Sequence, residues 1–503
     1  MMESRILLVR CDASVAIGTG HAMRCLALAQ VWQDTGGCAV FAMAQTTPAV
    51  EERLQREKIK VVQRKAEPGS GDDAQQTVVL ARENQAAWVV IDGYCFGADY
   101  QTALKDAGLK VLFIDDNGHA GHYSADIVLN QNAHAGESLY RSREVSTQLL
   151  LGPRFAVLRR EFAAWRGWKR EIPKTARNVL VTMGGSDPDN LTAKVIEAIR
   201  ELANPELETA ILVGGSNPHL PAVEAAAKKD SMRVTVDAAN IPELMAWADV
   251  AVAGAGTTFW EICFLGLPAI LLTLAENQNA VALAGEGMGT AWSLGNGGDV
   301  SACDIAGKLA QLIDSREVRS RQSEQGRRLV DGRGAERVLA FLSDLEFRRT
   351  IDSDCEVFWE WANDPEVRAA SFNGKVISWE DHTRWFRAKL GDPQALFYTA
   401  SKDGQPVGEV RYQVNGKRAV LSISLDPRFR GRGWGQRILA LGTERAFQDT
   451  EVEFIDAYVK PSNQASLKLF AGAGFQRFPS EVIEGQEGVH FVLEKHNRSI
   501  EST

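Results

Sequence analysis

Cysteine is sparse in this sequence and never occurs at the spacing of a metal or redox motif. The seven cysteines are scattered over 503 residues, without any Cys-x-x-Cys pair. A reduced protein therefore fits this pattern better than a disulfide framework or a zinc ribbon. The seven are Cys11, Cys25, Cys38, Cys95, Cys263, Cys303 and Cys355.

Long apolar runs and an excess of basic residues are also missing. No stretch approaches the roughly 18 apolar residues that span a membrane, and the apolar run 6–9 is followed at once by Arg10, unlike a signal peptide. The net charge of −9 argues against a nucleic-acid partner, which usually requires a basic face. We therefore expect a soluble, cytoplasmic protein with neither a membrane nor a nucleic acid as partner.

The composition is that of an ordinary globular protein, with 45% hydrophobic and 24% charged residues. A chain of 503 residues is too long for one hydrophobic core, which predicts two or three domains. In the first part, short apolar runs alternate with helical patterns such as residues 21–35. This alternation predicts parallel βαβ units in a doubly wound sheet. The expected strands are residues 6–9, 39–42, 88–91, 111–114 and 127–130.

A second series of the same kind begins at residues 178–182. Its further strands are expected at residues 210–213, 234–236, 250–253 and 269–272. Two consecutive α/β domains commonly bind a nucleotide or sugar between them, outside the carboxyl ends of their strands. A last helix is expected from residue 335 to about residue 346, followed by a turn at residues 347–350.

After that turn the expected strands become antiparallel in style, at residues 396–400, 406–414 and 419–425. The Asn415-Gly416 pair between two of them is a strong hairpin signal. We therefore predict an α/β chain of three domains. Residues 1–165 and 174–342 form two Rossmann-like domains, and residues 347–497 form a mixed-sheet α+β domain.

A glycine-rich loop follows the strand that ends at Leu425 and opens a helix expected at residues 436–447. Three glycines in alternate positions let the backbone approach a ligand closely. The helix N-terminus adds the positive end of its dipole, and two arginines add full charges, which predicts a pyrophosphate site rather than a plain turn. The residues concerned are Arg430, Gly431, Arg432, Gly433 and Gly435.

This loop resembles the acyl-CoA signature of the GNAT superfamily of N-acetyltransferases, and the resemblance covers about residues 347–494. A second family element matches at Asn463-x-x-Ser466, followed by Gly474-Phe475. A further stretch is similar to the branch that acetylates small molecules and ribosomal N-termini. It comprises Trp361, Asn363, Asp364, Pro365, Val367, Arg368, Ser378 and residues 382–386.

The resemblance implies acetyl-CoA as co-substrate and direct attack of an amine on its thioester. It further implies that the strand ending at Leu425 supplies a backbone donor and that Asn463, with Ser466, binds the cofactor. Many members carry a tyrosine four residues before the final Gly-Phe pair, where this chain has Phe470. The general acid therefore stays unassigned, with Tyr458 and Ser466 as candidates. Glu409 is either the base or a solvated carboxylate on a strand.

The first domain carries a second glycine loop, Gly18-Thr19-Gly20-His21-x-x-Arg24, between its first strand and a helix. His21 lies in the first helical turn, where the dipole disfavours an imidazolium, so we expect a neutral ring that accepts a proton. The alternative is a histidine that merely begins a helix. Its position beyond the carboxyl end of a strand favours a functional role.

The second domain offers two further loops at strand ends. Met183-Gly184-Gly185-Ser186-Asp187 has the geometry of a phosphate loop, and Gly254-Ala255-Gly256-Thr257-Thr258 suits a diphosphate. Glu261, on the helix that follows, suits ribose hydroxyls. The segments Gly266-Leu267-Pro268 and Glu276-Asn277-Gln278 come next.

This order of loops resembles the two-domain nucleotide-sugar glycosyltransferase fold of the peptidoglycan GlcNAc transferase. It is more closely similar to the UDP-sugar hydrolase family of pseudaminic acid biosynthesis, over about residues 5–340. The matching features are Arg10-x-Asp12, the His21 loop, Asp92-x-Tyr94, Asp115-Asp116, residues 126–130, Leu151-Gly152 and Leu158-Arg159. Asp115 and Asp116 with His119 and His122 suggest a metal site as an alternative, although the resembled family works without metal.

The resemblance implies that His21 is the base that activates water and that Asn277 and Tyr94 lie near the sugar. Water would invert the anomeric centre, and N–H donors would stabilise the departing diphosphate. The residues assigned to substrate binding are Asp12, Gly20, Arg24, Gly185, Gly256, Thr257 and Glu261.

Together these resemblances predict an acetyltransferase that modifies the 4-amino group of UDP-4-amino-4,6-dideoxy-β-L-AltNAc, joined to a hydrolase that releases UDP from the product. One alternative is a glycosyltransferase that passes the sugar to an acceptor. Another is a non-catalytic nucleotide-sugar sensor with a vestigial acetyltransferase. A pathway to legionaminic acid or another nonulosonate is a third, within the same chemistry.

Overall fold

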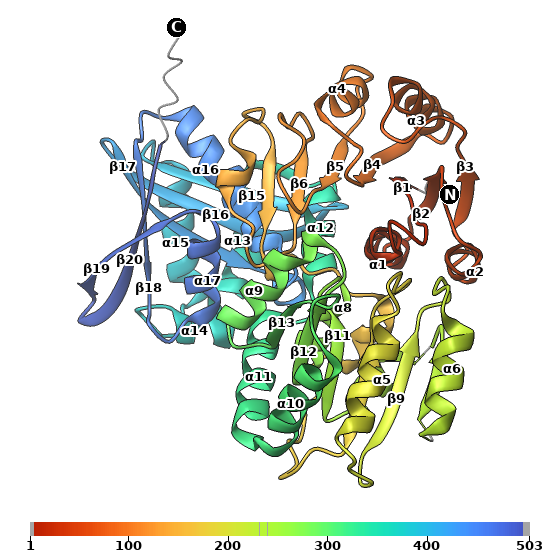
Figure 1. Ribbon diagram of the computed structural model, residues 1–503. Helices are drawn as coiled ribbons and strands as arrows, with labels where there is room; N and C mark the ends of the chain where they lie inside the picture. Colours follow the sequence, from red (N-terminus) through yellow and green to blue (C-terminus); the bar gives the residue numbers. More distant parts are fainter. Residues whose placement is uncertain (1–4, 231, 239, 496–503) are drawn as a thin grey trace, which may run out of the picture. The chain divides into compact units, whose positions relative to one another are not determined.

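The computed structural model describes residues 5–230, 232–238 and 240–495. The chain divides into two compact units, of which the first ends at Leu339 and the second begins at Ala340. The division lies within helix α12 (Gly334–Leu342), coloured green in Figure 1. None of the helices in the described ranges has the length and apolarity needed to cross a membrane.

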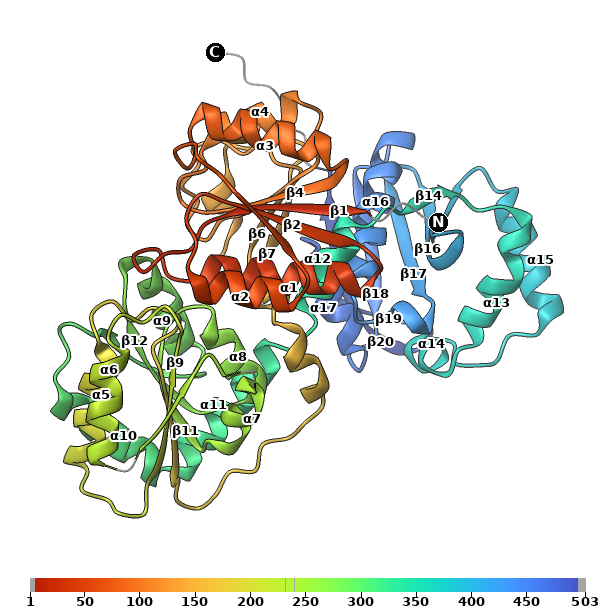
Figure 2. The same ribbon diagram turned by 90° about the vertical axis from the view of Figure 1, so that its right-hand side faces the viewer.

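The first unit opens with a seven-stranded parallel sheet in the order β3-β2-β1-β4-β5-β6-β7. Its central strands are almost wholly buried, as expected for a parallel sheet covered on both faces. Figure 2 shows α1 and α2 along one face and α3 and α4 along the other. The strands are β1 (Ile6–Cys11), β2 (Cys38–Met43), β3 (Lys60–Gln63), β4 (Ala86–Asp92), β5 (Val111–Ile114), β6 (Ile127–Asn130) and β7 (Gln148–Leu151). The helices are α1 (Gly20–Asp34), α2 (Pro48–Arg56), α3 (Gly71–Glu83) and α4 (Ala98–Asp106), with 3₁₀ turns η1 (Glu137–Tyr140), η2 (Pro153–Phe155) and η3 (Arg160–Trp165).

A second parallel sheet, of six strands, has the order β10-β9-β8-β11-β12-β13. Helices α5, α6 and α10 cover one face and α7, α8 and α11 the other (Figure 2). The strands are β8 (Asn178–Thr182), β9 (Glu208–Val213), β10 (Arg233–Val236), β11 (Val250–Gly254), β12 (Ala269–Thr273) and β13 (Trp292–Asn296). The helices are α5 (Leu191–Glu201), α6 (Leu220–Lys229), α7 (Ile241–Trp247), α8 (Thr258–Leu265), η4 (Glu276–Gln278), α9 (Asn279–Gly287), α10 (Ala302–Asp314) and α11 (Arg316–Leu329).

Both sheets start in the middle and grow outward in two directions, so the predicted doubly wound α/β architecture is confirmed. The strand order reverses between β1 and β4 in one sheet and between β8 and β11 in the other. Ligands of such sheets bind at these reversals, beyond the carboxyl ends of the strands. The loops singled out from the sequence follow β1, β4, β8 and β11.

The second unit contains a seven-stranded mixed sheet in the order β14-β15-β16-β17-β18-β20-β19. Its strands pair antiparallel except for β17 and β18. The strands are β14 (Glu346–Arg349), β15 (Ala395–Lys402), β16 (Gln405–Asn415), β17 (Arg418–Leu425), β18 (Phe454–Val459), β19 (Gln476–Ile483) and β20 (Gln486–Glu494). The helices are η5 (Asp352–Asp354), α13 (Cys355–Asn363), α14 (Pro365–Ala370), α15 (Trp379–Leu390), η6 (Pro427–Phe429), α16 (Trp434–Asp449) and α17 (Gln464–Gly472).

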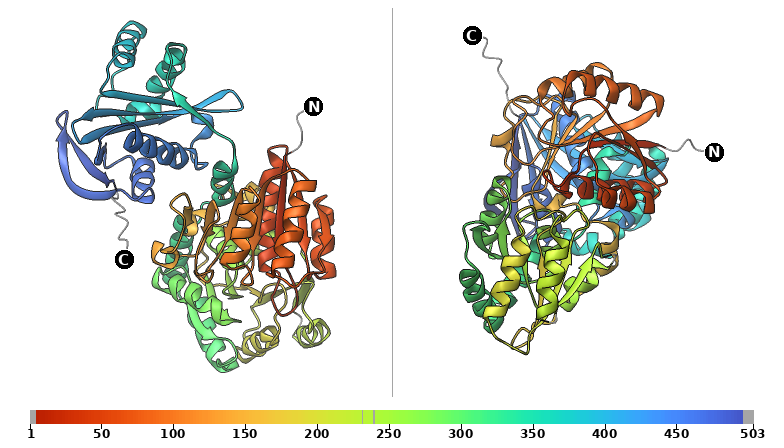
Figure 3. Two further views of the ribbon diagram at one scale, coloured as in Figure 1. Left: turned by 90° about the horizontal axis from the view of Figure 1, so that it is seen from above. Right: turned by 45° about the vertical axis from the view of Figure 1, so that its right-hand side comes forward.

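Helices lie on both faces of this sheet, with α16 on one and α13 and α15 on the other (Figure 3, left). Gly442 of α16 lets the helix approach β16 closely, because a Cβ there would lie 2.6 Å from Val410 Cγ1. On the opposite face, Phe358 of α13 and Phe386 of α15 form a small core with Phe397 of β15.

The parallel strands β17 and β18 are paired at one end only and diverge along the rest of β17. Strand β17 pairs with β18 only from Arg418 to Val420. Further along β17, the Asp426 N–H donates to Val407 O on the β16 side. Because alternate residues of a strand point their N–H groups to opposite neighbours, those of Ile423 and Leu425 face the opening beside β18.

The turn expected at residues 347–350 is wrong, because residues Glu346–Arg349 form the edge strand β14, antiparallel to β15. Phe347 stacks on Tyr398 at a centroid distance of 5.1 Å, and this contact holds the short charged segment to the sheet. The preceding helix also ends earlier than expected, at Leu342. The hairpin at Asn415-Gly416 is confirmed, since Asn415 pairs with Arg418.

Candidate active sites

A cavity of about 340 Å³ lies in the first unit, between the loops at the carboxyl ends of its two sheets. This volume is within the range of ligand pockets, roughly 300–1,000 Å³. Nine of the predicted site residues line it: Gly20, His21, Arg24, Tyr94, Gly185, Gly256, Thr257, Glu261 and Asn277. The structure thus brings together residues that are separated by up to 257 positions in the sequence.

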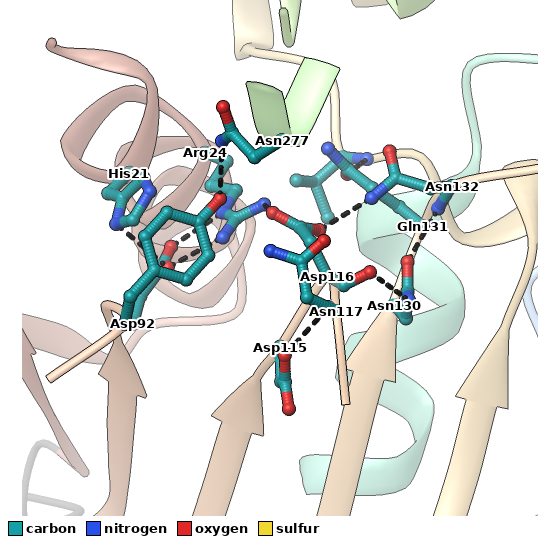
Figure 4. Close-up of polar contacts among 12 residues, drawn as sticks. His21, Arg24, Asp92, Asp115, Asp116, Asn117, Asn130, Gln131, Asn132 and Asn277 are labelled. Carbon is teal, nitrogen blue, oxygen red and sulfur yellow. Dashed lines mark hydrogen bonds and ion pairs between the residues drawn. The ribbon is translucent and has the colours of Figure 1, made fainter. Parts of the chain in front are cut away.

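His21 faces this cavity from the first turn of α1, beside the buried carboxylate at the end of β4. Its Nδ1 lies 3.3 Å from Asp92 Oδ1 (Figure 4). The ring of Tyr94 stands edge-on to His21 at a centroid distance of 5.1 Å. Asn277 Nδ2 donates to the Tyr94 hydroxyl at 2.7 Å, so this contact joins the two α/β domains across the cavity.

Arg24 binds two carboxylates next to His21. Its Nε and Nη2 donate to the two oxygens of Asp92 at 2.6 and 2.7 Å, and its Nη1 donates to Asp116 at 2.6 Å. Burial alone raises the pKa of Asp92, but Arg24 and then His21 outweigh it and leave that pKa lowered. Asn132 donates to the other oxygen of Asp116 at 2.6 Å. The cluster therefore holds two acidic groups and one guanidinium (Figure 4).

Asp12 is the one predicted residue of this unit that does not reach the cavity. Its carboxylate accepts from the N–H groups of Ala44 and Gln45, at 2.6 and 3.0 Å, and pairs with Arg10 at 2.8 Å. Arg10 is fully buried and also binds Asp73. Asp12 thus fixes the chain after β2 by accepting these two backbone hydrogen bonds.

The glycine loops of the two domains meet at the cavity. A Cβ on Gly185 would lie 1.9 Å from Thr19 Oγ1, so only glycine fits there. Gly20 faces Thr257 at the start of α8, where the helix N-terminus offers N–H donors to an anion. Glu261 of α8 accepts from Arg159 at 2.7 Å; burial raises its pKa, and Arg159 only partly offsets this.

The residues that suggested a metal site in the sequence form hydrogen bonds and ion pairs with other parts of the first domain. Asp115 accepts from the backbone of Asn117 and from His119 Nδ1 at 2.8 and 2.9 Å, and from the Tyr123 hydroxyl. His122 pairs instead with Glu144 at 3.2 Å. In the described ranges, no group of three or more His, Cys, Asp or Glu side chains is placed to hold a metal ion.

In the second unit, the glycine loop turns the chain sharply into α16. Gly431 and Gly433 adopt φ angles of 74° and 89°, a left-handed region that other residues rarely enter. Arg432 is exposed and forms no ion pair within the described part of the chain. Arg430 differs from the expectation of a free charge, because it pairs with Asp364 at 2.8 Å and Glu366 at 2.9 Å.

These features fit the acyl-CoA cofactor that the sequence implies. The loop presents a helix N-terminus without an acidic side chain in its first turn, which suits a pyrophosphate. Leu425 and Ile423 direct N–H groups into the opening between β17 and β18, and Gly435 packs against Leu425. Asn463 Oδ1 caps α17 by accepting from Ser466 N–H at 3.1 Å, so its carboxamide oxygen is used in the fold.

The candidate general acids and the candidate base of the second unit lie in different environments. Phe470 is core, packed on Phe475 and Phe491. Tyr458 stacks on His490 at 4.7 Å. Glu409 is 3% exposed, which contradicts the solvated alternative, and its Oε2 is buried without a hydrogen-bond partner in the described structure. Burial raises the pKa of Glu409, partly offset by Arg411 and Ser424.

The sequence did not assign roles to two residues at the cavity of the first unit, Asn132 in its lining and Asp92 buried behind His21. Asp92 belonged to a matching pattern, but only the fold shows that it faces His21. Asn132 lies two residues beyond β6 and reaches Asp116 through the loop that follows. The available signal was their position at the end of a strand or just beyond one, in a parallel sheet whose carboxyl ends meet at one edge.

Two parallel-sheet domains with a cavity between them, followed by a split mixed sheet with a glycine loop, define a chain that joins a GT-B-type unit to a GNAT acetyltransferase domain. Residues 178–294 match the glycosyltransferase family 28 C-terminal domain, and residues 344–476 match the acetyltransferase (GNAT) domain. The two resemblances at the level of these families are thereby confirmed.

Over 240 residues the chain is 32% identical to the spore coat polysaccharide biosynthesis protein SpsG of Bacillus subtilis (strain 168), covering 47% of this chain and 69% of that protein. The chain belongs to the family of this protein. It is 22% identical to the uncharacterized protein MJ1062 of Methanocaldococcus jannaschii, over 93% of this chain and 96% of that one. It is also 23% identical to the acetyltransferase PseH of Campylobacter jejuni, over 25% of this chain and 78% of PseH.

Proposed function

We propose that the chain is a bifunctional enzyme of nonulosonate biosynthesis, in the branch that leads to pseudaminic acid. The second unit N-acetylates the 4-amino group of UDP-4-amino-4,6-dideoxy-β-L-AltNAc with acetyl-CoA. The first unit then hydrolyses the UDP-2,4-diacetamido sugar to UDP and the free sugar. The observation that carries the hydrolase part is His21 on Asp92, facing the Tyr94–Asn277 contact across the cavity.

The proposed hydrolysis uses His21 as general base. With Nδ1 towards Asp92, the other ring nitrogen is the one that accepts a proton from water. The water oxygen forms a bond to the anomeric carbon as the bond to the diphosphate oxygen breaks, which inverts that centre and releases UDP. The surplus carboxylate near Arg24 stabilises both the imidazolium and the positive charge that develops on the sugar.

The nucleotide is held by the second α/β domain in this proposal. Gly256, Thr257 and the N-terminus of α8 donate N–H groups to the diphosphate, so the leaving group needs no protonation by a side chain. Glu261 binds the ribose hydroxyls with its position fixed by Arg159. Tyr94 and Asn277 position the sugar next to His21.

For the acetyltransferase part, acetyl-CoA supplies an acetyl thioester when bound. The Gly431–Gly433 loop and the N-terminus of α16 hold the pyrophosphate, with Arg432 beside them. N–H groups of Ile423 and Leu425 orient the cofactor arm in the opening between β17 and β18. SpsG is named as a polysaccharide biosynthesis protein, which supports a role in a sugar pathway. PseH is named as an acetyltransferase, which supports acetyl transfer by the second unit.

The experiment is to follow the acetylated UDP-sugar with the full chain by proton NMR, in water and without any acceptor. We expect UDP and a free sugar whose first-formed anomer is inverted. The glycosyltransferase family 28 match favours a second candidate, a transferase that needs an acceptor. Turnover only after adding an acceptor would establish that candidate, and UDP binding without turnover would indicate a sensor.

A further inference from the structure

The face of the second unit's sheet that lies opposite α16 carries an unusual set of charged side chains. Residues Gly408 and Val410 of β16 face α16, so the alternate residues Glu409 and Arg411 point to the other face. The Arg411 guanidinium lies 4.9 Å from the Trp385 ring of α15, in agreement with this orientation. This face adjoins the opening beside β18, because Glu409 pairs with Ser424, next to Leu425.

Two arginines near this face lack a close carboxylate. Arg411 Nη2 donates to Ser422 Oγ at 3.1 Å, and its nearest carboxylate oxygen belongs to Glu409 at 3.9 Å. Arg368 of α14 donates to the carbonyls of Asn373 and Lys375. Its Nε is buried without a partner, and it forms no ion pair with any described residue.

The two guanidinium groups are within electrostatic reach of each other. Burial lowers the pKa of Arg368, and the positive charge of Arg411 lowers it further. By contrast, Arg418 and Arg348 of this unit are neutralised at short range, since Arg418 binds Asp456 at 2.9 Å and Arg348 binds Asp354 at 2.8 Å. The pair Arg368 and Arg411 is therefore left with an excess of positive charge.

Such a pair suits a phosphate, because guanidinium groups bind phosphate oxygens through charge-assisted hydrogen bonds. The unpartnered oxygen of Glu409 instead requires a hydrogen-bond donor, because burying a carboxylate without one is costly. An ammonium group satisfies it. Glu409 and Arg411 are two residues apart on β16, so their side chains lie on the same face of the sheet, and the nearest atoms of the carboxylate and the guanidinium are 3.9 Å apart.

We propose that this face is the acceptor site and that it selects an amine carried on a phosphate-linked sugar. Glu409 receives the ammonium group, and Arg411 with Arg368 holds the phosphate. The inference rests on the proposed acetyltransferase function and adds to it the residues that recognise the amine and the phosphate of the acceptor. A polyamine or another polycation is repelled by the two arginines.

In the proposed reaction, Glu409 acts as the general base. Its carboxylate takes one proton from the ammonium, and the nitrogen lone pair then forms the bond to the acetyl carbon. The carbon–sulfur bond breaks with its electrons on sulfur, and a second proton from the nitrogen passes to that sulfur. The products are an amide and a free thiol, and Glu409 returns its proton to solvent.

The test compares two acceptors with the full chain: the UDP-linked 4-amino sugar and the methyl glycoside of the same sugar. Arg411→Gln and Arg368→Gln are each expected to raise KM, and the Kd of the UDP-linked acceptor in calorimetry, about 10- to 100-fold. Neither variant should change KM for the methyl glycoside. Arg384→Gln is the matched control, because Arg384 on α15 is exposed and pairs only with neighbours on its own helix.

Glu409→Gln is expected to lower kcat about 100-fold or more, with the Kd of acetyl-CoA unchanged as evidence of an intact fold. Unchanged KM values in both arginine variants, or an equal rise for both acceptors, would overturn the phosphate subsite while leaving acetylation of the UDP-sugar by the wild type intact. Failure of the wild type to acetylate either amine, although acetyl-CoA binds, would instead remove the proposed function and this inference with it.

Discussion

Replacing His21 by alanine is expected to slow UDP release from the acetylated UDP-sugar about 10²- to 10⁴-fold, the usual contribution of a general base. His21 is the only histidine that lines the cavity among the described residues. Its Nδ1 lies beside Asp92, whose pKa stays low, so the carboxylate remains ionised and fixes the ring. Removing the ring leaves the nucleotide loops in place, so the Kd of UDP should stay unchanged. Release is measured by a coupled UDP assay.

His122→Ala is the matched control for this variant, because His122 is partly exposed and pairs with Glu144 away from the cavity. It should hydrolyse at the wild-type rate. Acetylation by the second unit should be the same in both variants. Wild-type hydrolysis by His21→Ala would show that another group activates water and would withdraw the role assigned to His21.

Replacing Gly433 by valine is expected to weaken acetyl-CoA binding at least about 100-fold and to stop acetylation. Gly433 has a φ of 89°, where a side chain costs roughly 1–2 kcal/mol, and a β-branched residue fits worst. The new side chain also projects from the loop whose N–H groups are proposed to hold the pyrophosphate. Calorimetry with acetyl-CoA measures the loss, and hydrolysis of the already acetylated UDP-sugar should be retained.

The control separates backbone strain from loss of the binding loop. Gly485, in the turn between β19 and β20, has a φ of 78° and no atom near its potential Cβ. Gly485→Val therefore imposes a similar strain without touching the cofactor loop. Equal loss of acetyl-CoA binding in both variants, or full binding in Gly433→Val, would contradict the proposed role of the loop.

Much of the fold could be predicted from the sequence, because local patterns determine it. Buried apolar runs between helical segments define parallel strands, and the observed strands include every one expected in the first unit. The glycine loops at residues 18–20 and 431–435 were recognisable since each follows a strand and precedes a helix. In such a context the backbone geometry is nearly fixed by local sequence.

The features that sequence did not predict depend on contacts between distant residues. Strand β14 is stabilised by the stacking of Phe347 on Tyr398, which lies 51 positions away in the sequence. The charged residues beside Phe347 had suggested a turn instead. Asp12 directly follows a strand, as many site residues do, but its carboxylate accepts hydrogen bonds from the backbone N–H groups of Ala44 and Gln45. The burial of Glu409 depends on helices that cover the sheet, which the pattern of one strand does not reveal.

One measurement tests the order of the two proposed reactions. The full chain is incubated with UDP-4-amino-4,6-dideoxy-β-L-AltNAc, with and without acetyl-CoA, and UDP is quantified over time. The proposal predicts UDP release only when acetyl-CoA is present, after the acetylated UDP-sugar has formed. Accumulation of acetylated UDP-sugar without UDP would contradict the hydrolase, and equal UDP release without acetyl-CoA would contradict the order.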